Sequence, residues 1–97
     1  MGMQKVLSID TSSNKQIIIG LRVNEKQHWI KKKIGNRKAQ VVLPMIDRWL
    51  RQHKVSLKDL RSIRVNAGPG SFTGIRVGMA IANALSFALK IPIKMIK

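Results

Sequence analysis

A glycine-containing segment at residues 67–78 (AGPGSFTGIRVG) holds the residue types best suited to binding an anion. It follows a short predicted strand and opens a predicted helix, where free backbone N–H groups and the helix dipole favour a phosphate. Ser71 and Thr73 would add hydroxyl donors, and Arg76 would add a positive charge one turn into the helix. The candidate phosphate or nucleotide ligands of this segment are Gly68, Gly70, Ser71, Thr73 and Arg76.

The spacing of these glycines matches neither the P-loop pattern nor the dinucleotide-binding fingerprint. A capped helix preceded by a tight turn therefore explains the segment at least as simply. The helix cap would be Ser71 or Thr73, because a short hydroxyl side chain accepts a hydrogen bond from the first free N–H groups of a helix.

A second candidate is Asp10-Thr11-Ser12, a carboxylate beside two hydroxyls directly after the first predicted strand. Such a group could hold a Mg²⁺-bound water or a phosphate, although a turn in which Asp and Ser bond their own backbone is an equally good interpretation. Only its pairing with the glycine loop favours a ligand site. The chain has no Cys and two histidines, His28 and His53, so we predict no catalytic residue and no metal site.

The elements that would position these residues follow from hydrophobic periodicity. Strands are predicted at residues 5–9, 16–23, 27–34, 63–66 and 91–96, helices at 38–53 and 73–89, and one helical turn at 56–59. The order β-β-β-α-β-α-β, without an internal repeat or a linker, predicts one α/β domain in which two helices pack against a mixed sheet. Gly20 lies inside the second strand and suggests a β-bulge there.

The two predicted helices carry different stripes. The first has the apolar stripe of an amphipathic helix, formed by Val42, Met45, Ile46, Trp49 and Leu50. The second repeats small residues every four positions, at Gly74, Gly78, Ala82 and Ser86. Two glycines inside a helix cost about 1 kcal/mol each relative to Ala, and close packing against another helix of this chain or of a second molecule would offset that cost. We expect the sheet to be covered by the opposite stripe, Val77, Ile81, Leu85 and Ala88.

The charge balance is strongly basic, with 19 Lys and Arg against 4 Asp and Glu and a formal net charge of +15. Hydrophobic residues make up 44% of the chain, which excludes a disordered basic tail. Dense basic runs lie at residues 31–33, 37–38, 48–54 and 61–64, so we expect contact with a polyanion. The chain has two Trp, two Phe and no Tyr, so the sequence argues against a base-stacking platform of the single-strand-binding kind.

No targeting or membrane segment is predicted. The first ten residues contain too short an apolar stretch for a signal peptide. The apolar segment at 75–89 is interrupted by Arg76, Asn83 and Ser86, and it falls short of the ~18–20 residues that a membrane span needs. We therefore expect a soluble cytoplasmic protein.

Several motifs resemble those of the TsaB (YeaZ) family. They are IDTS at 9–12, VLPMID at 42–47, SLKDL at 56–60, GPGSFTGIRVG at 68–78 and ALSFALKIP at 84–92. These motifs occur in the family's order over essentially the whole chain, and the glycine signature at 68–78 is specific to the family.

The resemblance implies a lobe of the ASKHA fold, which is actin-like and RNase H-like. It also implies a noncatalytic partner of TsaD in making threonylcarbamoyladenosine in tRNA; TsaD carries the metal and the transfer chemistry, and TsaE is an ATPase that joins them. The two helices of this family build an interface with TsaD or with a second TsaB. The interface residues implied for this chain are Val42, Met45, Ile46, Trp49, Gly74, Gly78, Ala82 and Ser86.

The chain departs from the family in its extent and its charge. Residues 1–97 resemble the N-terminal lobe, and we expect the second lobe to be absent. Because an ASKHA nucleotide site lies between two lobes, ATP or ADP is expected only in a complex. The basic surface suggests a contact with tRNA. The alternatives are a standalone basic nucleic-acid-binding module and a small nucleotide-binding ATPase that uses Asp10 and the glycine loop.

Overall fold

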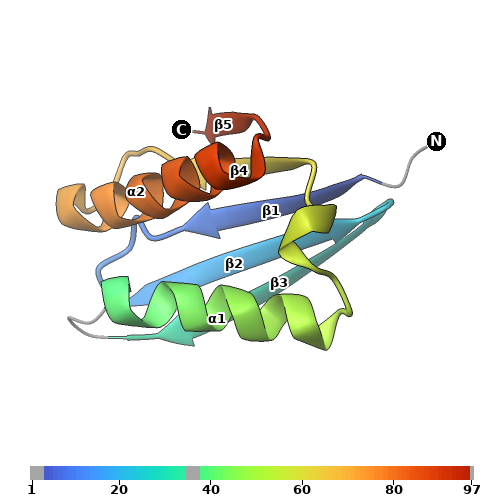
Figure 1. Cartoon of the computed structure of the whole chain (residues 1–97). Helices are drawn as coiled ribbons and strands as arrows, with labels where there is room; N and C mark the ends of the chain where they lie inside the picture. Colours follow the sequence, from blue (N-terminus) through green and yellow to red (C-terminus); the bar gives the residue numbers. More distant parts are fainter. Residues whose placement is uncertain (1–3, 35–37, 97) are drawn as a thin grey trace.

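The computed structural model describes residues 4–34 and 38–96, with the side chains of all of these except 38 and 39. Five strands form one sheet, and two long helices lie together on one of its faces (Figure 1). In chain order the elements are β1 (Lys5–Asp10), β2 (Gln16–Val23), β3 (Lys26–Lys33), α1 (Lys38–Gln52), the short 3-10 helix η1 (Leu57–Asp59), β4 (Ser62–Asn66), α2 (Phe72–Leu89) and β5 (Ile93–Ile96). Arg37, which belongs to one predicted basic run, lies outside the described residues.

The sheet is mixed, with the strand order β3-β2-β1-β4-β5. The first three strands form an antiparallel meander, whereas β4 and β5 run parallel to β1. This confirms the predicted α/β architecture, and each predicted strand and helix ends within two residues of its expected position. Because β1 and β4 are parallel neighbours, their carboxyl ends meet at the same edge of the sheet.

The core lies between the sheet and the helices. Leu7 pairs with Leu21 across β1–β2 and with Ile63 across β1–β4, and all three side chains are fully buried. The helical side of this core includes Val42, Met45, Ile46 and Trp49 of α1, each no more than 7% exposed. The interface role expected of these four residues is therefore wrong, because the single apolar stripe of α1 packs against the sheet.

The small-residue stripe of α2 also faces the sheet. Gly74, Gly78 and Ala82 are buried, and a Cβ on Gly78 would lie 2.5 Å from Thr11 Oγ1 at the end of β1. The absent side chains let α2 approach the sheet closely, so the expected helix partner for this stripe is wrong. The cost of glycine in a helix is offset by packing on the sheet.

A second stripe of α2, formed by Val77, Ile81, Leu85 and Ala88, was expected to cover the sheet, but it lies beside the buried small-residue stripe instead. Val77, Ile81 and Leu85 are partly buried against the edge of the core, and Ala88 is exposed. Ser86, the last member of the small stripe, is half-buried and donates a hydrogen bond to the Ile91 carbonyl oxygen. That bond closes the turn from α2 into β5.

The length of α2 corrects the expectation that this segment is too short for a membrane span. The helix has 18 residues with a mean hydropathy of 1.4, and by length and composition it is the one helix among residues 4–34 and 38–96 that could cross a membrane. One such helix is weak evidence for a span. Its contacts with β1, β4 and β5 place it within the α/β domain.

Gly20 forms no bulge. The pairing of β2 with β3 is unbroken, and Gly20 lies opposite Trp29. A Cβ on Gly20 would lie 2.5 Å from the indole ring of Trp29, so the glycine makes room for that ring. Its neighbours Ile19 and Leu21 are buried toward the helices, and the Gly20–Trp29 pair therefore lies on the other face of the sheet.

Candidate functional site

The loops that follow β1 and β4 meet at one edge of the sheet. Asp10 ends β1 and Asn66 ends β4. One carboxylate oxygen of Asp10, Oδ1, accepts hydrogen bonds from the Ser12 N–H at 3.0 Å and the Ser12 Oγ at 2.6 Å. The other, Oδ2, accepts one from Asn66 Nδ2 at 3.2 Å. The carboxylate therefore ties the loop after β1 to the end of β4.

Asn66 continues this network into the glycine loop. Its Oδ1 accepts a hydrogen bond from the Gly68 N–H at 2.9 Å, and its Nδ2 lies 3.4 Å from Ser12 Oγ. Sequence reasoning missed Asn66. The available signal was an Asn two residues before the glycine, because an Asn side chain commonly bonds the backbone two positions on.

The glycine loop crosses directly over Ser12. Gly70 has φ +156°, and a Cβ there would lie 2.7 Å from both the Cβ and the carbonyl oxygen of Ser12. The Ser71 N–H donates to that carbonyl oxygen at 2.7 Å. Gly68 has φ +132°, in the region that favours glycine. The two predicted segments thus lie in contact, while a phosphate or nucleotide bound there stays a prediction.

The start of α2 is held by side chains of this chain. Ser71 Oγ accepts a hydrogen bond from the Gly74 N–H at 3.2 Å, which confirms Ser71 as the helix cap. Thr11 is fully buried and donates to the Gly74 carbonyl oxygen. Thr11 therefore fastens β1 to α2, a packing role that the sequence did not predict. Thr73 is exposed.

Arg76 makes a different contact from the one expected. Its guanidinium carbon lies 5.2 Å from the centroid of the Phe72 ring, within the range of a cation–π interaction. Both side chains are exposed on α2. Within the described part of the chain, no three His, Cys, Asp or Glu side chains come together as a metal site.

Large apolar side chains lie exposed on both helices. Phe87 is 87% exposed, Phe72 73% and Leu43 50%. Leu43 lies on α1 and the two phenylalanines on α2, and Figure 1 shows the two helices next to each other on one face of the sheet. We call these three residues the outer helix surface. Contiguous exposed apolar patches mark protein–protein contacts, so we treat these three side chains, spread along the two helices, as the candidate contact surface.

Known proteins share this architecture. The structure of YeaZ from Pseudomonas aeruginosa superposes with a TM-score of 0.92 at 29% identity, over 98% of this chain and 44% of that one. TsaB of Buchnera aphidicola subsp. Schizaphis graminum is 41% identical, over 91% of this chain. A family model described as TsaD, tRNA N6-adenosine threonylcarbamoyltransferase, matches residues 25–97. This chain belongs to the TsaB (YeaZ) family.

The similarity to TsaB proteins confirms the family predicted from the motifs and the ASKHA-like fold. TsaB of Haemophilus influenzae is 35% identical, over 91% of this chain and 37% of that protein. The chain spans about 40% of the length of these curated relatives: 41% of the Buchnera protein and 37% of the Haemophilus protein. A tRNA N6-adenosine threonylcarbamoyltransferase of Nitrosospira multiformis is 42% identical over 54% of this chain and 15% of that protein.

Proposed function

We propose that this TsaB-family chain is a noncatalytic, cytoplasmic interaction subunit in the biosynthesis of threonylcarbamoyladenosine in tRNA, and that it docks on a TsaD-like protein. The single observation that carries the proposal is the outer helix surface. Phe87 and Phe72 are largely exposed on the helix whose small residues pack on the sheet. A partner that covered these rings would remove their apolar area from water.

A noncatalytic role fits the chemistry of the strand ends. The side chains of Asp10, Ser12 and Asn66 bond one another and the glycine loop. We therefore assign this cluster to positioning the loop and the start of α2. In the alternative, an ATPase, the cluster would bind nucleotide; ATP or ADP would then need a partner to complete the site, because the cluster lies at the edge of a single sheet.

A second copy of this chain is the alternative occupant of the outer helix surface, and a TsaE-like protein is a further partner of the complex. tRNA is proposed as a ligand of the basic surface, because a net charge of +15 favours a polyanion. These partners differ in mass, so they can be separated in solution.

The experiment is light scattering of the purified chain, alone and with a TsaD-like protein from the same source. We expect a heterodimer. Phe87→Glu replaces the most exposed ring of the proposed contact with a charge and should weaken the complex roughly 30-fold or more, the effect of an interface hot spot. The matched control is Leu57→Glu, a substitution of another exposed apolar residue in η1, which should leave the complex intact.

Three other outcomes are informative. A heterodimer that survives Phe87→Glu would show that TsaD docks elsewhere. If the chain forms a homodimer that does not bind TsaD and that Phe87→Glu abolishes, the outer helix surface would still be the interface, but its partner would be a second copy of this chain. A monomer under both conditions would contradict the proposal.

A further inference from the structure

The beginning of α2 positions one end of the outer helix surface. Phe72 is the first residue of α2, and its side chain is 73% exposed. The ring contacts Arg76 one turn further on, where the guanidinium carbon lies 5.2 Å from the ring centroid, and Arg76 is exposed as well. Because neither side chain packs into the core, the position of the Phe72 ring depends on the backbone that enters the helix.

That backbone is held by the loop after β1. The N–H of Ser71, the residue before Phe72, donates a hydrogen bond to the Ser12 carbonyl oxygen at 2.7 Å. Gly70 crosses over the same residue, since a Cβ on Gly70 would lie 2.7 Å from the Ser12 Cβ. One hydrogen bond and one close contact therefore join the entry to α2 to a single residue of the other loop.

Ser12 is fixed in turn by Asp10. The Ser12 N–H and hydroxyl both donate to Asp10 Oδ1, at 3.0 Å and 2.6 Å, and Asn66 Nδ2 donates to Asp10 Oδ2 at 3.2 Å. We call Asp10, Ser12 and Asn66 the strand-end cluster. Asp10 belongs to β1, a strand that pairs with β2 on one side and with β4 on the other. A continuous series of hydrogen bonds thus runs from a central strand of the sheet to the residue before Phe72.

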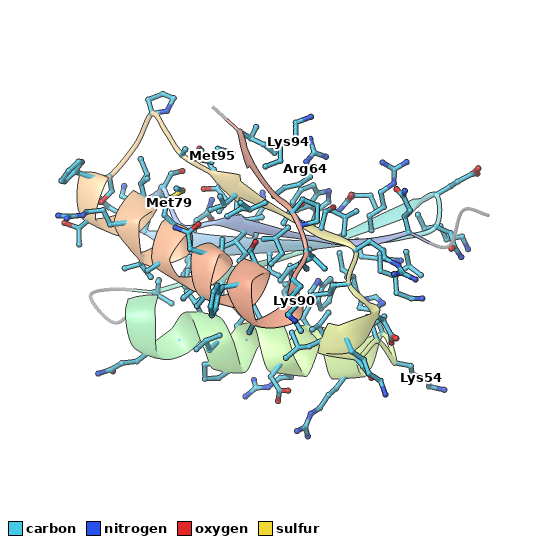
Figure 2. All side chains as sticks on the ribbon, turned by 45° about the horizontal axis from the view of Figure 1, so that its top comes forward. Lys54, Arg64, Met79, Lys90, Lys94 and Met95 are labelled. Carbon is cyan, nitrogen blue, oxygen red and sulfur yellow. The ribbon has the colours of Figure 1, made fainter. Side chains whose placement is uncertain are left out.

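The other end of the outer helix surface is held by different bonds. Phe87 lies about 22 Å from Phe72 along the helix axis, at about 1.5 Å per residue. Next to Phe87, the Ser86 hydroxyl donates to the Ile91 carbonyl oxygen, and the Ile91 N–H donates back to the Ser86 carbonyl oxygen at 3.1 Å. Lys90, which is labelled in Figure 2, ends the helix between them. Neither bond involves the strand-end cluster, so the two rings are positioned separately.

We propose that the strand-end cluster controls one of the two ring contacts with the partner: Asp10, acting through Ser12, positions Phe72 for docking and has no such effect on Phe87. Asp10 is then a positioning residue, a half-buried carboxylate that acts on the contact through a hydrogen-bond network. The inference rests on the proposed function, because it takes a TsaD-like protein as the partner that covers the outer helix surface.

The test is the affinity of the full chain for the TsaD-like protein, measured by calorimetry for the wild type and Asp10→Ala. The matched control is Asp59→Ala. It removes another carboxylate that accepts a backbone hydrogen bond, from the Ser56 N–H at 3.0 Å, but beside η1 rather than α2. We expect Asp10→Ala to bind about tenfold more weakly, a usual size for coupling through a network. The control should bind within about twofold of the wild type.

A double-mutant cycle separates positioning of Phe72 from a general loss of structure. In a Phe72→Ala background, Asp10→Ala should cost no more than about twofold in affinity, because the ring that it positions is gone. In a Phe87→Ala background it should still cost about tenfold. Equal costs in the two backgrounds would overturn the inference while leaving the proposed function intact. A wild type that does not bind the TsaD-like protein would contradict the proposed function, and this inference with it.

Amide hydrogen exchange in the free chain tests the positioning without a partner. We expect the Ser71 and Gly74 N–H groups to exchange faster in Asp10→Ala, because their hydrogen bonds hold the entry to α2. The Ile91 N–H should exchange at the wild-type rate, and Asp59→Ala should change none of the three. Unchanged exchange at Ser71 would overturn the inference. If Asp10→Ala does not fold, Ser12→Ala replaces it: this variant removes one of the bonds to the carboxylate and should weaken the complex about threefold.

Discussion

The hydroxyl of Thr11 occupies the space that a side chain on Gly78 would need. A Cβ on Gly78 would lie 2.5 Å from Thr11 Oγ1, and Thr11 is fully buried and bonded to the Gly74 carbonyl oxygen. Since Thr11 is β-branched and fixed, the clash cannot be relieved by a rotamer change. One contact between the end of β1 and the middle of α2 therefore sets how closely the helix sits on the sheet.

Gly78→Ala is expected to destabilise the fold by about 1–3 kcal/mol through overpacking, although Ala is the better helix former by about 1 kcal/mol. Gly78→Leu should prevent folding. Urea denaturation followed by circular dichroism measures both. In a double-mutant cycle, Thr11→Ala removes the obstructing hydroxyl, so Gly78→Ala should cost less in that background. An undiminished cost would show that the contact with Thr11 is not the cause.

Gly20→Ala would create a contact as short as that of Gly78→Ala, but we expect it to cost much less stability. Its Cβ would lie 2.5 Å from the Trp29 ring, but that ring is the end of a side chain that is 55% exposed and can move. We expect a change in unfolding free energy below about 1 kcal/mol and a red shift of the tryptophan emission as the indole swings into water. A loss as large as that of Gly78→Ala would mean that Trp29 is fixed by more than Gly20.

The sequence predicted the elements well because their periodicities are clear. The three-and-four spacing of Val42, Met45, Ile46 and Trp49 marked α1, and the run of β-branched residues at 17–19 marked β2. The orientation of α2 was not predictable in the same way. In an amphipathic helix the large apolar residues normally mark the buried side. In α2 the small residues are buried instead, because Gly78 packs against Thr11, which lies 67 positions away in the chain.

The cluster of Asp10, Ser12 and Asn66 at the ends of β1 and β4 was predictable only in part. Asp10 and the glycine loop were paired from their residue types, and the parallel pairing of β1 with β4 brings them together. Asn66, which joins them, was missed, although its position two residues before Gly68 was an available signal for a side chain that bonds the loop backbone. The row Trp29, Gly20, Ser8, Arg64 and Lys94 across the sheet was beyond prediction, because it comes from five different strands whose order and register depend on the whole fold.

Asp10→Ala is expected to destabilise the domain by about 1–3 kcal/mol. The carboxylate accepts hydrogen bonds from Ser12 and Asn66, and its loss frees the two loops that carry the start of α2. Asp10→Asn should cost less, because one amide oxygen can still accept a bond. The melting temperature, measured without any ligand, distinguishes the two roles of Asp10: a residue that positions the loops lowers it when removed, whereas a residue that only binds a ligand does not. If Asp10→Ala melted like the wild type, the cluster would not be holding the loops.

Acidification is expected to weaken the fold through His53. Burial lowers the pKa of His53 below its usual 6.5, and the neighbouring His28 lowers it further; the two rings lie 4.5 Å apart. The Nε2 of His53 is shielded and has no hydrogen-bond partner. The unfolded chain therefore takes up the proton more readily than the native one, so this contribution to stability is complete above about pH 6.5 and is lost as the pH falls below it.

Melting temperatures measured between about pH 7.5 and pH 5.5 should fall for the wild type and change less for His53→Gln. His28→Gln is the matched control: it removes the repulsion between the two rings but leaves His53 half-buried against Trp49, whose ring lies 4.4 Å away. It should therefore retain most of the pH dependence, since burial is the larger cause. If His28→Gln abolished the dependence while His53→Gln kept it, the prediction would be contradicted, and the packing of His53 against Trp49 would have no part in the response to acid.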